Sequence, residues 1–94
     1  MYLHLGGETI VNTDEIMGIF DMDNATISYK TREFLADAEK NKKVIYVSSE
    51  LPKSFVICME EDDYRVYICQ LASVTIIKRI EQYSGKGPGR ILFE

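Results

Sequence analysis

The sequence contains one histidine, His4, and two cysteines, so few side chains are available for catalysis or metal binding. A serine-type hydrolase needs a nucleophile beside a histidine that an acid orients. His4 instead lies in an alternating stretch, which predicts a surface or structural position on a strand. Cys58 and Cys69 form no C-x-x-C pair, so their spacing fits neither a zinc site nor a redox motif.

Both cysteines lie in apolar runs typical of strands, and we expect them to be buried thiols. If these strands are antiparallel neighbours that turn at Asp62 and Asp63, Cys58 faces Tyr67 rather than Cys69. A diagonal pair of this kind is normally too far apart to form a disulfide. A change of register by one residue weakens this argument.

Several sequence motifs of enzymes and ion sites are absent. The chain has no G-x-S-x-G, H-E-x-x-H, Walker loop or G-x-G-x-x-G. Residues 85–89, GKGPG, lack the preceding strand and the G-K-[ST] of a phosphate loop. The acidic run at 60–63 lacks the spaced ligands and the glycine of a calcium loop, and we interpret it as a turn. We therefore predict no enzyme, no catalytic or metal-binding residues, no cofactor and no small-molecule substrate.

No basic leader or long apolar run is present, which argues against a secretory signal and a membrane-spanning helix. We expect a cytoplasmic protein that does not bind a membrane. The 94 residues predict one domain over residues 1–83. Residues 84–94 are rich in glycine and predict a flexible tail. Because 46% of the residues are hydrophobic in so short a chain, we expect a homo-oligomer that buries the excess.

Charge is distributed unevenly along the chain. The net charge of -4 argues against a protein that coats nucleic acid indiscriminately. Residues 1–25 carry five acids and no lysine or arginine, whereas residues 73–93 carry Lys78, Arg79, Lys86 and Arg90 against Glu81 alone. If this polarity survives folding, one surface repels phosphate and another tolerates it.

The hydrophobic pattern predicts an α+β fold, a small antiparallel β-sheet domain with one amphipathic helix after the third strand and a short C-terminal helix. Thr31, Phe34, Leu35 and Ala38 recur at helical spacing, with Ser28 as N-cap. Residues 74–83 suit a helix or a strand, and Ser73 as a cap favours the helix. The predicted helix covers residues 28–41, and the predicted strands cover residues 2–5, 9–11, 16–20, 44–47, 54–59 and 64–69.

Several short motifs agree in order and spacing with one known family. They are YLHLG at 2–6, EIMGIFD at 15–21, EFL at 33–35, LPKSFV at 51–56 and KR at 78–79. Over residues 1–80 the chain resembles the RemA/RemB family of extracellular-matrix regulators. The resemblance implies a mixed α and β protein without enzymatic activity that takes part in transcriptional control of biofilm matrix genes.

The RemA branch of this family binds DNA, assembles into rings and presents arginines in loops around the ring. The loop that corresponds to its arginine-rich loop is ELPKS at 50–54, where Lys53 is the sole cation. Glu15 stands where that branch has a basic residue before the third strand. The chain therefore departs from the RemA pattern at two expected phosphate contacts.

Two functions are consistent with these features. In the first, the protein is an oligomeric array, a ring on the family pattern, that regulates matrix genes and contacts the DNA backbone weakly through Lys53, Lys78, Arg79 and Arg32. In the second, it is a protein-interaction or scaffold module of the same fold that does not bind DNA, which the acidic first quarter favours. An enzyme that uses His4 or the cysteines is a third interpretation.

Overall fold

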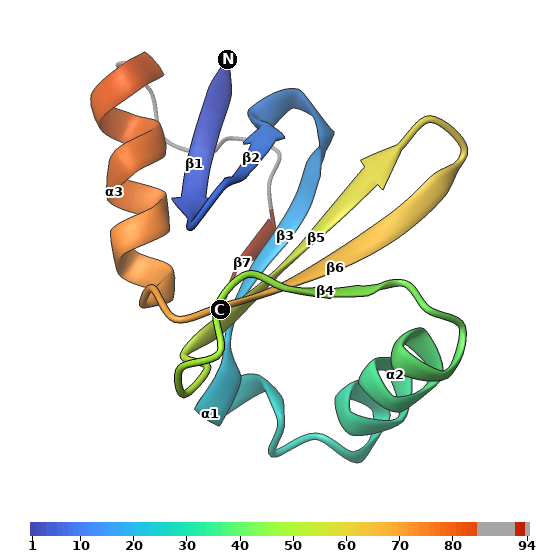
Figure 1. Cartoon of the computed structure of the whole chain (residues 1–94). Helices are drawn as coiled ribbons and strands as arrows, with labels where there is room; N and C mark the ends of the chain where they lie inside the picture. Colours follow the sequence, from blue (N-terminus) through green and yellow to red (C-terminus); the bar gives the residue numbers. More distant parts are fainter. Residues whose placement is uncertain (85–91, 94) are drawn as a thin grey trace.

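The protein folds as an α+β domain, as the sequence predicts (Figure 1). The structure is a computed structural model that describes residues 1–84 and 92–93. Its elements in chain order are β1 (Tyr2–Gly6), β2 (Thr9–Asn12), the 3-10 turn η1 (Thr13–Glu15), β3 (Ile16–Asp21), α1 (Met22–Ala25), α2 (Tyr29–Lys40), β4 (Val44–Tyr46), β5 (Ser54–Glu60), β6 (Asp63–Cys69), α3 (Ser73–Ser84) and β7 (Leu92–Phe93).

The main sheet has the strand order β4-β6-β5-β3-β7 in the described part of the chain. Its centre is antiparallel, since β5 pairs with both β3 and β6 in that sense. The edge strands β4 and β7 are parallel to their neighbours β6 and β3. Strands β1 and β2 form a separate antiparallel hairpin. The predicted antiparallel sheet thus carries a parallel strand at each edge.

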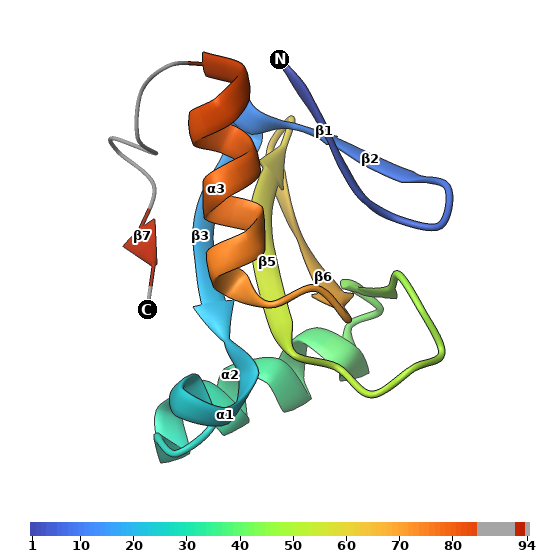
Figure 2. The same ribbon diagram turned by 90° about the vertical axis from the view of Figure 1, so that its left-hand side faces the viewer.

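Alternation along β5 gives the main sheet two apolar faces, because successive side chains on a strand point to opposite sides. Val56 and Cys58 pack in one core with residues of α3 and the β1–β2 hairpin. Phe55 packs in the other core with Ala25 of α1 and Ala38 of α2. The sheet is therefore enclosed between α3 and the hairpin on one face and α1 and α2 on the other (Figures 1 and 2).

Helix α2 confirms the predicted amphipathic helix to within one residue at each end. Ala38 is fully buried, and Phe34 and Leu35 are partly buried against the same core. Ser28 occupies the N-cap position, but its side chain makes no capping hydrogen bond.

Residues 73–84 form a helix, which settles the alternative between helix and strand. The carbonyl of Ala72 accepts the first bonds, from the amides of Thr75 and Ile76, so Ser73 is the first helical residue rather than the cap. The short helix α1 was not predicted. It begins where the Asp21 carboxylate accepts from the amides of Asp23 and Asn24, an N-cap arrangement.

The predicted turn of the β5–β6 hairpin is displaced by one residue, so the predicted cross-strand pairing is wrong by two residues. Glu60 pairs with Asp63, so the turn is formed by Glu61 and Asp62, and Cys58 lies opposite Arg65 instead of Tyr67. Both cysteines are free and buried, as predicted. The predicted tail, residues 84–94, lies mostly outside the described residues, and within it Leu92–Phe93 pairs with β3.

Candidate nucleic-acid interface

Lys53 lies at the end of the loop before β5, and its backbone is held on two sides. Its amide donates to the carbonyl of Cys69 at 2.8 Å, and its carbonyl accepts from the amide of Met22 at 2.9 Å. The side chain is exposed and makes no hydrogen bond or ion pair within residues 1–84 and 92–93. The fold therefore fixes the Lys53 backbone and leaves its ammonium available to a ligand.

The rest of this loop is anchored at Ser48. The Ser48 hydroxyl donates to Oε1 of Gln70 at 2.8 Å and accepts from the amide of Glu50 at 3.1 Å. Leu51, between these anchors, has 82% of its surface exposed. A single exposed apolar side chain is common on protein surfaces, so Leu51 by itself does not define a contact surface.

Acidic residues stand close to Lys53 in the fold. Asp21 neighbours this position because it pairs with Ser54, and Asp23 lies in the first turn of α1. Glu50 belongs to the same loop. These carboxylates lower the local potential, so a single Lys53 attracts phosphate less than an isolated cation would.

Arg32 supports the turn between α1 and α2. Its Nη1 donates to the carbonyls of Thr26 at 2.7 Å and Ile27 at 2.8 Å. Its guanidinium carbon lies 6.0 Å from the centre of the Tyr29 ring. Arg32 thus has a structural role, although a guanidinium has five N–H donors and the others remain for a ligand.

Lys78 and Arg79 lie on α3, across the sheet from α2 (Figure 2). Arg79 donates from Nη1 to the carbonyl of His4 at 3.2 Å, which ties α3 to β1. His4 is exposed, and its Nε2 donates to the carbonyl of Gly7 at 2.7 Å, so it stabilises the β1–β2 turn. Lys78 is exposed.

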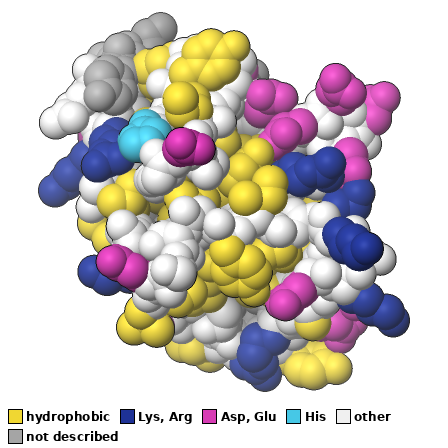
Figure 3. Space-filling model, in the orientation of Figure 1, with side chains coloured by type: hydrophobic (Ala, Val, Ile, Leu, Met, Phe, Trp, Pro, Cys, Tyr) yellow, Lys and Arg dark blue, Asp and Glu magenta, His cyan; other side chains and the backbone are white. Residues whose placement is uncertain are grey.

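The four predicted contact residues do not form one surface within a single subunit. Lys78 and Arg79 lie on one side of the sheet, Arg32 lies on the other, and Lys53 lies at the end of β5. Figure 3 shows lysines and arginines interspersed with acidic side chains over the displayed face, without one large basic patch.

An ion pair that was not predicted from the sequence lies at the turn of the β5–β6 hairpin. The ammonium of Lys43 bonds to Oδ2 of Asp63, and Arg65 reaches the same oxygen at 3.2 Å. The hydrogen bond from Lys43 lowers the pKa of Asp63. Charge spacing gives no signal for this pair, because Lys43 and Asp63 meet only once β4 lies beside β6.

Three titratable side chains, Tyr67, Cys58 and Cys69, lie in the core on the face of the sheet covered by α3. Burial raises the pKa of the Cys58 and Cys69 thiols to about 12. Burial also raises the pKa of Tyr67, whose hydroxyl donates to Oε2 of Glu60. A thiol with so high a pKa is protonated at neutral pH and is a poor nucleophile or metal ligand.

Within the described ranges, no three side chains of the histidine, cysteine and carboxylate types lie together as a metal site would require. None of the helices in those ranges has both the length and the apolar composition needed to cross a bilayer.

The sequence of this chain agrees with a known class of protein. A family described as RemA-like, Extracellular matrix regulatory protein A-like, matches residues 2–80. The chain therefore belongs to this family of extracellular matrix regulatory proteins, which confirms the resemblance seen in the sequence. It is 36% identical over 81 residues to Extracellular matrix regulatory protein B of Bacillus subtilis (strain 168), a match that covers 86% of this chain and 91% of that protein.

Proposed function

We propose that this protein regulates the expression of biofilm matrix genes in the cytoplasm, as a homo-oligomer whose repeated Lys53 side chains contact the DNA backbone. The observation that carries the proposal is the geometry of Lys53, whose backbone is bonded on both sides while its ammonium is exposed and unpaired. Because the backbone is already fixed, binding to phosphate costs the rotamer entropy of the side chain alone. The role is that of a binding protein without catalysis.

The array is necessary because one lysine contributes little. Each neutralised phosphate adds a modest, salt-dependent contribution, and linked contacts act together at high effective concentration. Exposed apolar side chains give copies of the chain a reason to associate, since such surface is unusual on a monomer when it is extensive. Those more than half exposed within the described residues are Tyr2, Ile10, Met17, Ile27, Tyr29, Tyr46, Leu51 and Val74.

A scaffold that binds protein instead of DNA is the second candidate. The observation that favours it is the acidic surrounding of Lys53, with Asp21 and Asp23 at the same end of the sheet. Glu15, the last residue of η1 before β3, also carries the wrong sign for phosphate. In this case the exposed Leu51 would meet a protein surface.

Complementation of a deletion strain tests the regulatory role. The wild-type gene should restore matrix-gene transcripts, Lys53→Glu should not, and Lys40→Glu should. Lys40 is an exposed residue in the last turn of α2, so its reversal changes the net charge equally at a distant site. Full restoration by Lys53→Glu, at equal protein levels, would contradict the role given to Lys53 and favour the scaffold.

A further inference from the structure

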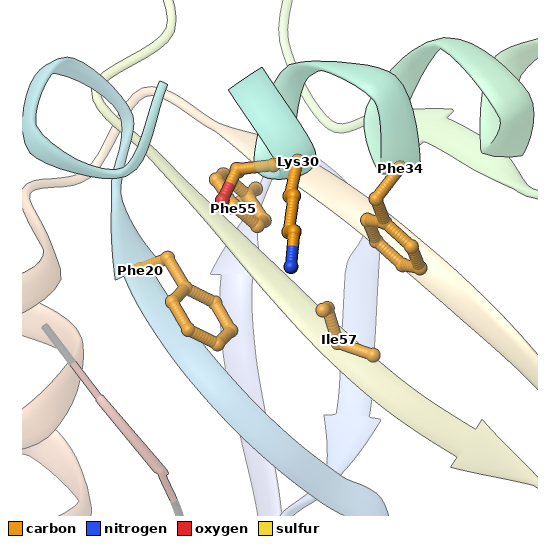
Figure 4. Close-up of a pocket in the computed structure, with 6 residues that line it drawn as sticks. Phe20, Lys30, Phe34, Phe55 and Ile57 are labelled. Carbon is orange, nitrogen blue, oxygen red and sulfur yellow. The ribbon is translucent and has the colours of Figure 1, made fainter. Parts of the chain in front are cut away.

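A cavity of about 210 Å³ opens between α2 and the sheet. Phe20 of β3 and Phe55 and Ile57 of β5 line it from the sheet, and Lys30, Thr31 and Phe34 line it from α2. We propose that this cavity binds a small carboxylate with a single aromatic ring or a branched aliphatic body. Figure 4 shows the Lys30 side chain extending from α2 into the space between the apolar residues.

The walls of the cavity are preformed because the aromatic rings that line it pack against neighbouring rings. Phe20 and Phe55 are stacked, with ring centroids 5.0 Å apart and an interplanar angle of 19°. The ring of Phe34 packs against the ring of Tyr64, with the two ring centroids 5.7 Å apart. A rigid apolar wall favours binding, since little side-chain entropy is lost when a ligand enters.

The size of the cavity restricts the ligand. Pockets for drug-sized molecules have volumes of roughly 300 to 1,000 Å³. The smaller volume found here, about 210 Å³, suits one ring or a branched chain of similar bulk. Flat aromatic walls favour a ring, which can stack or pack edge to face against Phe20 and Phe34.

Lys30 determines the charge of the ligand. Lys30 is exposed, and its ammonium makes no hydrogen bond or ion pair within the described residues, while its side chain extends along the apolar walls. A carboxylate bound against these walls would give the ammonium a charge-assisted hydrogen bond. The Thr31 hydroxyl is a second donor at the rim. A phosphate dianion would leave one charge unpaired against the rings, which disfavours it.

Amide NMR spectra of the isotopically labelled full chain, titrated with phenylacetate, test the site. We expect saturable shifts for the amides of Phe20, Thr31 and Phe55. The neutral isostere phenylacetamide should bind about tenfold more weakly, as should phenylacetate to Lys30→Met, because the charged bond is lost. Lys40→Met, which removes the same charge from the other end of α2, should leave the affinity unchanged.

Several outcomes would overturn the assignment. They are the absence of saturable shifts at millimolar phenylacetate, equal binding of phenylacetamide, equal binding to Lys30→Met, and saturation of the same amides by inorganic phosphate. Shifts of these amides on raising the protein concentration alone would show that a second copy fills the cavity, and would also refute it. None of these results depends on DNA binding.

Discussion

The amide of Lys53 donates to the carbonyl of Cys69 at 2.8 Å, which joins the loop before β5 to the end of β6. The carbonyl of Lys53 accepts from Met22 at the start of α1, so two neighbouring elements define where this residue stands. Each copy in an oligomer would therefore present the backbone of Lys53 in the same position, with its side chain free to reach a phosphate. Regular spacing of weak contacts is what allows an array to bind the DNA backbone.

Self-association is the first expectation. Because Leu51, Ile27 and Tyr29 are largely exposed, purified protein should scatter light as an oligomer at micromolar concentration. Sedimentation velocity gives an independent measure of the mass. A single species with the mass of one chain would remove the basis for collective DNA contact.

The stability should fall at high pH. The pKa values of Cys58 and Cys69 are raised to about 12 by burial, so the folded state keeps protons that the unfolded chain loses at about 8.5. This contribution is fully present below the unfolded value and is lost as the pH rises towards the folded one. Urea unfolding across this range should show a declining free energy of unfolding, and Cys58→Ala should make the decline shallower. A free energy that stays constant would contradict the burial of both thiols.

Phe55 should contribute strongly to stability. It is 1% exposed and stacks on Phe20 in the core beneath α2. Truncation of a buried phenylalanine to alanine usually costs about 3–5 kcal/mol, so Phe55→Ala should lower the free energy of unfolding by that amount. Tyr2→Ala, at a position 72% exposed, is the matched surface control and should change it by less than about 0.5 kcal/mol. Equal effects of the two substitutions in urea unfolding would contradict this packing.

Asp63 should titrate below the ordinary aspartate range. Its pKa is lowered first by the hydrogen bond from Lys43, with Arg65 adding to the effect. Any stability from this ion pair is present above the ordinary pKa and is lost as the pH falls through the depressed one. Carboxyl NMR should place the midpoint low in the wild type and higher in Lys43→Met, with Lys40→Met as control. An unchanged midpoint in Lys43→Met would show that this bond is absent in solution.

The spacing of apolar residues predicted those helices and strands that depend on local sequence. Helix α2 and the central strands lie where apolar spacing of about 3.6 and 2 residues indicates. The β5–β6 turn could not be located as well, because Glu60, Glu61, Asp62 and Asp63 suit a turn equally. Glu61 accommodates a positive φ of 60° there, which a sequence pattern does not reveal. The turn was therefore misplaced by one residue, which shifted the predicted pairing by two.

The site was predicted less completely than the fold. Lys53 was chosen from its loop and stays a prediction, whereas the carbonyl partners of Arg32 and Arg79 depend on how distant segments pack. The cavity at Lys30 likewise joins residues of β3, α2 and β5 that are far apart in the chain. Strand order decides such contacts, and the parallel pairing of β4 with β6 has no counterpart in local sequence.

The salt dependence of binding to duplex DNA tests the central claim most directly. For the wild-type protein, the logarithm of the association constant should fall linearly with the logarithm of salt concentration, with a slope of about -0.9 for each phosphate contacted. Lys53→Glu should flatten this slope, and Lys40→Glu should not. Failure of the wild-type protein to bind DNA at low salt, or an unchanged slope in Lys53→Glu, would contradict the account.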